Sequence, residues 1–399
     1  MRILYSLPHP ADRLGIQNAG HMIRATAILG ALEKLGVEVI RLEAAAQLKT
    51  NTSVSLYRNV LKRVLPRSLA MILRDAMRIR HGKRYARKLI ESVRRFKPDV
   101  ILETHVAFSL AGKIASEETG IQLILDDCAP AWEEEQQYGV GLKSIARKIH
   151  GEVTAQAGLI VAVNNTLRNH LIAGGVDPKK LITVENGIDE KYFDSRLRGD
   201  SRRKQLRITD NSVVIVFVGS FQPYHRVDLL LHAFQRICTR LDVHLLLVGE
   251  GQTSQACTEL AHNLKIIDRV TFVGRAAYED VPSYIAACDI AVMPATNEYG
   301  NPMKVYEYMA MGKVVVAPDL PTITEIATHG INAYLFESEN VQKIAESLEL
   351  LTNDPVLRKR LGEQGLRLSS ELTWIKRSET LLSAIKKLLE TTSNRKSGE

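Results

Sequence analysis

A lysine and a glutamate at the start of one predicted helix are the most informative pair of side chains in this sequence. Residues 297–313 read NEYGNPMKVYEYMAMGK, in which a Gly/Asn/Pro loop precedes a helix-forming stretch from Met303. Backbone N–H groups at a helix N-terminus attract phosphate, and Lys304 in the first turn adds a positive charge. Glu307 follows one turn later on the same face, where a carboxylate would bind sugar hydroxyls and repel phosphate. The spacing indicates either a nucleoside diphosphate site or a capped helix with an i,i+3 ion pair.

Alternating strands and helices must position this loop. Strands are predicted at 2–6, 38–42, 99–103, 122–125 and 159–163, and again at 213–219, 243–248, 270–273, 290–293 and 314–317. Helices are predicted at 19–35, 109–118, 144–157, 228–239, 255–264, 282–287, 303–311, 340–352 and 355–368. Short buried strands separated by helices are typical of a parallel sheet that is covered on both faces. Ligands bind at the carboxyl ends of such strands, so the loops after Val218, Val248, Val273 and Met293 are expected to surround one site.

The length of 399 residues predicts two domains, because a single core rarely exceeds about 250 to 300 residues. The polar stretch 194–212 is the predicted linker. We therefore expect an α/β chain of two doubly wound domains, at 1–195 and 205–374, followed by a helix and tail at 375–399.

The composition is that of an ordinary globular protein, with 45% hydrophobic and 25% charged residues, and it excludes collagen-like, low-complexity and largely disordered classes. No apolar run approaches the roughly 20 residues of a membrane-spanning helix, and the first residues read directly into a strand rather than a signal peptide. The four cysteines are scattered without metal or disulfide spacing. These features predict a cytoplasmic protein.

The segment 302–312 has a close counterpart in one known family. It resembles the signature Pro-x-Lys-x-x-Glu-Tyr-Met-Ala-x-Gly of retaining glycosyltransferases of family GT4, whose two-domain Rossmann-like fold is called GT-B. Other segments resemble the same family in the same order: Asn186–Asp189, Val218–Leu231, Val248–Gly251, Val270–Arg275 and Leu372–Trp374. The resemblance covers about residues 159–390. It implies an N-terminal acceptor domain and a C-terminal nucleotide-sugar domain that face each other across a cleft, with the C-terminal helix crossing back to the N-terminal domain.

The resemblance also implies the donor site. Glu307 would bind the ribose, and the backbone near Arg275 the base. Lys304 and the backbone amides of Asn301–Met303 would bind the diphosphate. Besides Asn301, Pro302 and Met303, the remaining predicted donor residues are Gly219, Ser220, His225, Arg226, Gly249 and Tyr299.

This sequence departs from the family pattern at two places. Tyr299 stands eight residues before Glu307, where relatives have a glutamate beside the transferred sugar, so that carboxylate is either shifted to Glu298 or missing. The usual Gly-Arg pair is Gly219-Ser220, and the usual Lys-Gly is His225-Arg226. Which of Arg226, His225 and Lys304 supplies the phosphate cations stays open at this point.

On the acceptor side, Gly20 and His21 resemble the Gly-rich loop of the family, and a helix entry with a solvent-facing histidine is the alternative. His105, Asp126 and Asp127 follow predicted strands and are expected at the same edge. Asp126 or His105 is the candidate that orients or deprotonates the acceptor hydroxyl. The adjacent aspartates also suggest a metal, but the resemblance implies that none is needed, and we expect no metal and no cofactor.

The net charge of +8 is concentrated in one segment. Residues 58–97 contain 14 Lys and Arg against two acidic residues, so the rest of the chain is slightly acidic. Cations interleaved with apolar residues at helical spacing favour a helix on an anionic membrane surface. The alternatives are a solvated helix face and, with no recognition motif to support it, nucleic acid.

Taken together, these observations predict an enzyme that moves a hexosyl unit from a UDP- or GDP-linked sugar to a hydroxyl acceptor, with retention of configuration, in cell-surface polysaccharide or glycolipid synthesis. The acceptor would be a glycan, a glycolipid or a small molecule, and the enzyme would lie at the inner face of the membrane. The alternatives are a sugar-nucleotide epimerase of the same fold and a non-catalytic membrane or nucleic-acid adaptor. The base, the sugar and the acceptor are left open by the sequence.

Overall fold

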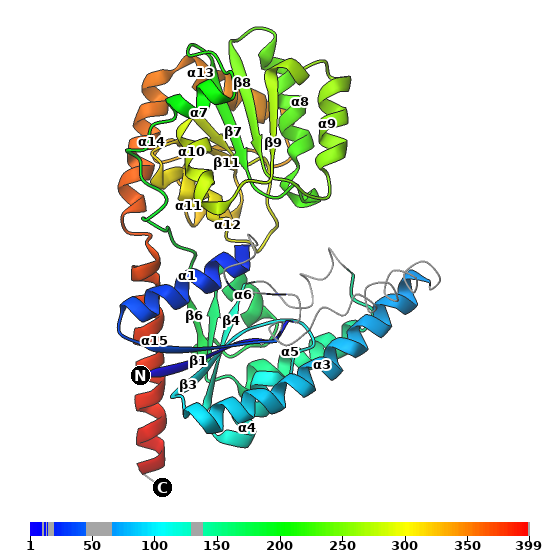
Figure 1. Cartoon of the computed structure of the whole chain (residues 1–399), viewed down its shortest axis with the longest axis vertical. Coiled ribbons are helices and arrows are strands. Elements are labelled where there is room, and N and C mark those ends of the chain that lie inside the picture. Colours follow the sequence, from blue (N-terminus) through cyan, green and yellow to red (C-terminus); the bar gives the residue numbers. More distant parts are fainter. Residues whose placement is uncertain (10–11, 13, 15–19, 45–65, 129–138, 398–399) are drawn as a thin grey trace. The chain divides into compact units, whose positions relative to one another are not determined.

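The computed structural model describes residues 1–9, 12, 14, 20–44, 66–128 and 139–397. Its internal contacts divide the chain into two units, Met1–Glu185 with Arg377–Glu399, and Asn186–Lys376. Each unit contains one six-stranded parallel sheet (Figure 1). The predicted α/β class with two doubly wound sheets is therefore confirmed.

The sheet of the first unit has the order β2-β1-β3-β4-β5-β6. Its strands are β1 (Arg2–Leu7), β2 (Glu38–Glu43), β3 (Val100–Thr104), β4 (Gln122–Asp127), β5 (Leu159–Ala162) and β6 (Leu181–Thr183). Its helices are α1 (Gly20–Lys34), α3 (Arg67–Phe96), α4 (Ala111–Thr119), α5 (Lys143–Gln156) and α6 (Asn165–Ala173). The sequence analysis missed β6, whose pairing depends on the edge of the sheet that it joins.

The second sheet has the order β12-β11-β10-β7-β8-β9. Its strands are β7 (Val213–Val218), β8 (Val243–Val248), β9 (Val270–Gly274), β10 (Ile290–Val292), β11 (Val314–Pro318) and β12 (Tyr334–Phe336). The helices of this unit are α7 (Asp200–Gln205), α8 (Val227–Cys238), α9 (Ser254–Asn263), α10 (Val281–Ala286), α11 (Met303–Ala310), α12 (Pro321–Thr324), α13 (Val341–Asn353) and α14 (Pro355–Ser369).

The second sheet has a buried core on both faces. Successive residues of β7 alternate between them, because side chains along a strand point to opposite sides. Ile215 and Phe217 pack with α8 and α13 in one cluster, whereas Val214 and Val216 pack with α10 and α11 in the other. This two-sided burial explains why the strand reads as an unbroken apolar run.

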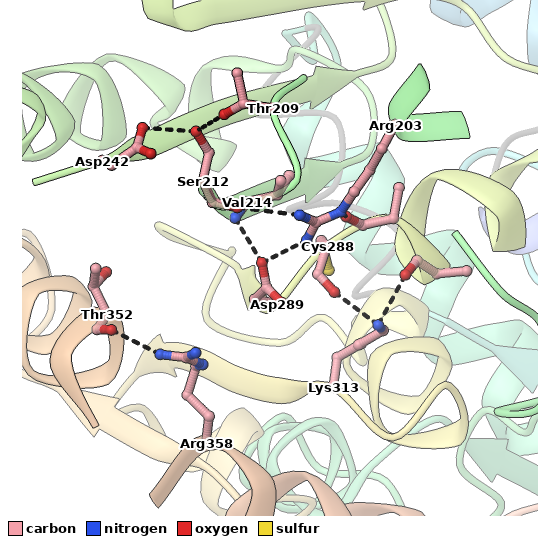
Figure 2. A network of polar contacts seen from close by, with 12 residues as sticks. Arg203, Thr209, Ser212, Val214, Asp242, Cys288, Asp289, Lys313, Thr352 and Arg358 are labelled. Atoms are coloured by element: carbon pink, nitrogen blue, oxygen red, sulfur yellow. Dashed lines mark hydrogen bonds and ion pairs between the residues drawn. The ribbon is translucent and has the colours of Figure 1, made fainter. Parts of the chain in front are cut away.

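The stretch 194–212, expected as a linker, belongs to the second unit. Its Arg203 donates from Nη2 to Asp289 Oδ2 (2.7 Å) and from Nε to the Ala287 carbonyl (2.8 Å). Asp289 also accepts from the backbone N–H of Val214 (2.8 Å), so it ties the stretch to the start of β7 (Figure 2). The basic residues of this stretch therefore include a structural ion pair, which their spacing did not reveal.

The last helix, α15 (Trp374–Ser397), begins in the second unit, and its residues from Arg377 onward belong to the first. Arg377 pairs with Glu185 (2.9 Å), and Leu381 and Ile385 are buried. The predicted return of the C-terminal helix to the N-terminal domain is confirmed. Among the described helices, none is long and apolar enough to cross a bilayer.

Candidate functional site

Two glycines bring the loops of the second sheet into close contact. Gly219 follows β7 with φ 150°, and Gly249 follows β8 with φ 129°. A Cβ atom on Gly249 would lie 1.9 Å from the carbonyl oxygen of Gly219, so no side chain fits there. The backbone N–H of Gly249 donates to the carbonyl of Gly274 at the end of β9 (2.8 Å). These contacts align the carboxyl ends of three neighbouring strands, as the sequence analysis predicted.

Helix α11 begins beside these loops, and a tyrosine and an asparagine fix its position. The backbone N–H of Val218 donates to Tyr308 Oη (2.8 Å). Asn301, just before the helix, accepts from the backbone N–H of Asn186 (3.0 Å) and donates to Tyr306 Oη (2.9 Å). The Asn301 side chain therefore holds the loop in place, which is a structural role beyond the predicted diphosphate contact.

Lys304 is buried at the start of α11. Its Nζ lies 3.3 Å from His225 Nε2 and 4.3 Å from the centroid of the Phe217 ring. A Cβ on Gly219 would lie 2.5 Å from the same Nζ, and the φ of 150° at this position is one that residues with a side chain rarely adopt. Burial lowers the pKa of Lys304 to about 7, although the charge of Glu307 opposes this shift. Phe217 is a contact that the sequence analysis missed.

Glu307 lies one turn further along the same helix. Tyr278 donates from Oη to Glu307 Oε1 (3.2 Å), and Glu307 is buried. Burial raises the pKa of Glu307 to about 7, against the lowering effects of the Tyr278 hydrogen bond and of Lys304. Tyr278 was not predicted, although it stands only three residues after Arg275 in the loop that follows β9. Lys304 and Glu307 thus share a buried helix face that can receive both a phosphate and a hydroxyl ligand.

The other predicted donor residues are less enclosed. Ser220, Arg275 and Glu298 are exposed, and Tyr299, Pro302, Met303 and Gly249 are half-buried. Arg226 binds Asp228 (3.0 Å) and Glu339 (3.1 Å), so two carboxylates already oppose its charge. Lys304 contacts His225 and lies beside Gly219, which in turn contacts Gly249, whereas the side chains of Glu298 and Arg275 are exposed.

In the first unit, the adjacent aspartates at the end of β4 face different partners. Arg24 of α1, almost fully buried, binds Asp126 through Nη2 (2.9 Å) and Nε (3.2 Å), and its Nη2 also donates to the Val184 carbonyl. Asp127 instead lies with its Oδ2 3.2 Å from Nδ1 of His105, which follows β3. Successive strand residues point to opposite faces, so the two carboxylates do not form one site.

His105 and Asp127 have a third buried neighbour, which sequence reasoning missed. The ring of His150 on α5 lies 4.9 Å from that of His105, centroid to centroid. Burial is the main cause that lowers the pKa of His150 to about 2. One donor atom from each of the three residues lies within 4.8 Å of the others, which makes them a group of the described chain that could hold a metal.

Of the predicted acceptor loop, residues 15–19 lie outside the described part of the chain. Gly20 is exposed at the start of α1, and His21 Nε2 lies 3.2 Å from Asp12 Oδ2. Burial raises the pKa of Asp12, but hydrogen bonds from His21 and His9 outweigh it and hold that pKa below its usual range. His21 is therefore paired with a carboxylate in this structure.

Two family models match the chain. Residues 200–367 match "Glycosyl transferases group 1", and residues 23–192 match "Glycosyltransferase Family 4". The two matches together span most of both structural units.

Curated relatives match about half of the chain. The chain is 29% identical over 209 residues to the N-acetyl-alpha-D-glucosaminyl L-malate synthase of Bacillus anthracis, covering 52% of this chain and 54% of the relative. It is 30% identical over 244 residues to the GDP-mannose-dependent monoacylated alpha-(1-6)-phosphatidylinositol monomannoside mannosyltransferase of Corynebacterium glutamicum. This match covers 59% of this chain and 62% of the relative. The chain thus spans about half the length of the curated relatives it matches.

Solved structures match over nearly the whole length. The sucrose-phosphate synthase of Thermosynechococcus elongatus gives a TM-score of 0.77 at 17% identity, over 98% of this chain and 99% of that one. The Anabaena protein HepE, solved in complex with UDP, gives a TM-score of 0.75 at 18% identity, over 97% of this chain and 100% of that one. At these identities the likeness establishes the fold.

Proposed function

This chain belongs to the group 1 glycosyltransferases, family GT4 with the GT-B fold, and we propose that it transfers a hexosyl unit from a nucleoside diphosphate sugar to a hydroxyl acceptor with retention of configuration. The observation that carries this proposal is the buried pair Lys304 and Glu307 on α11, next to the glycine loops after β7 and β8. A cation for phosphate and a carboxylate for ribose hydroxyls lie one helical turn apart there.

On this proposal, the second unit binds the donor. The diphosphate lies against Lys304 and the N-terminus of α11, where the Gly219 backbone leaves room for a close approach. Glu307, held by Tyr278, binds the ribose, and the backbone near Arg275 holds the base. Lys304 and the helix dipole stabilise the charge that develops on the leaving diphosphate as the sugar departs.

The first unit is proposed to bind the acceptor. Asp126 forms a buried ion pair with Arg24, so its carboxylate is already occupied and is poorly placed to act on an acceptor hydroxyl. His105, whose Nδ1 lies 3.2 Å from Asp127 Oδ2, is the better candidate to orient or deprotonate the acceptor hydroxyl. If the His105→Ala variant transferred sugar at the wild-type rate, His105 would not have this role.

The long helix α3 supports a membrane-facing acceptor side. One of its faces packs Tyr85, Leu89 and Val93 into the first unit. The opposite face exposes Leu69, Ile72, Leu73 and Met77 in its first half, and Arg80, Lys83, Arg84, Arg87 and Lys88 in its second. Apolar side chains beside cations suit the surface of an anionic bilayer. Residues 58–65 of the predicted basic segment lie outside the described part of the chain.

A lipid-linked acceptor would suit this surface. The Corynebacterium glutamicum relative is named for a phosphatidylinositol mannoside, which is a lipid. We therefore propose a glycolipid or a membrane-bound glycan precursor as the acceptor class, with the enzyme bound peripherally to the membrane.

The test is a panel of UDP- and GDP-linked hexoses incubated with the protein and analysed by mass spectrometry. Transfer to an acceptor, or slow donor hydrolysis, is expected for one donor. An altered nucleotide sugar without transfer would instead indicate an epimerase. If Lys304→Ala and Glu307→Ala both bind and consume the donor as the wild type does, the donor site lies elsewhere.

A further inference from the structure

The ammonium group of Lys304 is buried without a carboxylate at ion-pair distance, although Glu307 lies one turn further along the same helix. Within the described part of the chain, no carboxylate oxygen lies within 4.0 Å of its Nζ, and the contacts there are His225 Nε2 and the Phe217 ring. A buried charge without a counter-ion is costly unless a ligand supplies one or the group loses its proton. Lys304 is therefore arranged to receive an anion.

The orientation of His225 follows from its hydrogen bonds. Its Nδ1 contacts the carbonyl oxygen of Ser220, which can only accept, so Nδ1 carries the proton. In the neutral ring Nε2 is then an acceptor, and it faces Lys304 Nζ. The rings of Phe217 (5.7 Å) and Tyr224 (4.5 Å) pack against the imidazole and fix its position.

The charged groups around this pair are few. Glu307 lies on α11 itself, and Tyr278 approaches it from the loop after β9. Arg226, next to His225, is bound to Asp228 and Glu339. Burial, and then the charge of Lys304, hold the pKa of His225 well below its usual range, so the imidazole stays neutral.

We infer that His225 is a positioning residue, which holds Lys304 Nζ beside Gly219 so that the pair takes up one proton when the donor diphosphate binds. This inference rests on the proposed donor site. It changes the role of His225 from one of three candidate phosphate cations to a neutral acceptor that orients the lysine. A protonated histidine beside the ammonium would repel it, whereas the neutral ring does not.

Proton uptake follows from the change in surroundings. Burial lowers the pKa of Lys304 to about 7, so much of the lysine is unprotonated above that pH. A diphosphate beside Nζ favours the charged form. Binding at pH 8 therefore transfers a proton from the buffer to Lys304, and its release accompanies the departure of the product.

The experiment is calorimetric titration of the full chain with UDP and with GDP at pH 8, in HEPES and in Tris. The terminal phosphate is already ionised at this pH, so a difference in heat between the buffers reports protons taken up by the protein. We expect uptake approaching one proton in the wild type, and none in Lys304→Met. Wild-type binding without uptake would overturn the inference.

Variants of His225 test positioning directly. His225→Gln keeps an acceptor for Lys304 and is expected to retain most of the affinity, whereas His225→Leu should lose about tenfold or more, or about 1.4 kcal/mol. His244→Gln is the matched control, since this half-buried histidine of β8 bonds Thr271 instead. Equal affinities for the Leu and Gln variants would contradict the positioning role. Failure of both nucleotides to bind the wild type would instead contradict the proposed function.

Discussion

At the residue scale, the donor site depends on two ionisable side chains kept away from water. Lys304 and Glu307 are both buried, and burial moves their pKa values toward neutrality from opposite directions. Such groups weaken the unliganded fold but strengthen interactions with a ligand, because fewer water molecules compete for them. The hydrogen bonds from Tyr278 and to His225 keep them oriented.

The sign of the Glu307 shift predicts a stability effect. Its pKa is raised from 4.5 to about 7 in the folded state, so the folded state binds the proton more tightly than the unfolded state does. The contribution of Glu307 to stability is therefore fully present below about pH 4.5 and is lost as the pH rises through 7. Glu307→Gln should thus be more stable than the wild type at pH 8, by about 1 to 3 kcal/mol, and nearly equal at pH 4.5.

Urea denaturation followed by circular dichroism at both pH values measures this difference. Glu279→Gln, at an exposed position in the neighbouring loop, is the control and should change stability little at either pH. A Glu307→Gln variant that is less stable at pH 8 would show that the carboxylate is stabilised, not strained, in the fold.

At the element scale, helices α1 and α3 of the first unit differ in how their polar side chains are used. Arg24 anchors α1 to the end of β4 through Asp126, in a pair that is almost fully buried. Helix α3 instead buries one face and leaves a row of apolar and basic side chains on the other. The first contact is structural, and the second is a surface available to a partner.

Removing the charge of Arg24 should be costly. Arg24→Met leaves the Asp126 carboxylate buried without its cation, which is expected to cost about 3 to 5 kcal/mol. Adding Asp126→Asn should recover part of that loss, because no charge then remains unpaired. The comparison is Lys113→Met, which breaks the more exposed pair with Glu117 and should cost less than about 1 kcal/mol. Equal losses for the two single variants would mean that the buried pair contributes little.

The outer face of α3 should determine binding to anionic vesicles. Leu73→Glu combined with Met77→Glu replaces side chains that are 44% and 65% exposed, so the fold should keep its stability. Flotation with phosphatidylglycerol vesicles is expected for the wild type and should fall at least tenfold for the variant. Val356→Glu, 76% exposed on α14 in the second unit, is the matched control. Unchanged flotation of the α3 variant would contradict the membrane-facing role.

At the scale of the whole molecule, the chain comprises two units, each with its own sheet and core. The first unit also includes the C-terminal part of α15, so chain segments far apart in sequence complete it. The donor residues all lie in the second unit, whereas the proposed acceptor residues all lie in the first.

This division predicts two transitions in scanning calorimetry. A nucleoside diphosphate at about 100 times its Kd should stabilise the second unit by about 2.7 kcal/mol and raise only the transition temperature of that unit. Arg24→Met should lower only the transition temperature of the first unit. A single transition, or a nucleotide shift of both, would show that the units unfold together.

The sequence by itself determined the architecture and the donor signature. Unbroken apolar strands such as Val213–Val218 and amphipathic helices follow from local periodicity. The loop, Lys304 and Glu307 belong to one short segment, so the placement of the two side chains on one helix face could be predicted. The short strands β6 and β12 could not, because their pairing depends on the sheet that they join.

Only the tertiary structure decided which partner each polar side chain has. It places His225 against Lys304, Tyr278 against Glu307 and Arg24 against Asp126, over separations of 79, 29 and 102 residues. It also gives the adjacent Asp126 and Asp127 different partners, Arg24 and His105. The physical reason is that burial and charge pairing depend on distances between distant segments, and local sequence patterns carry no information about those distances.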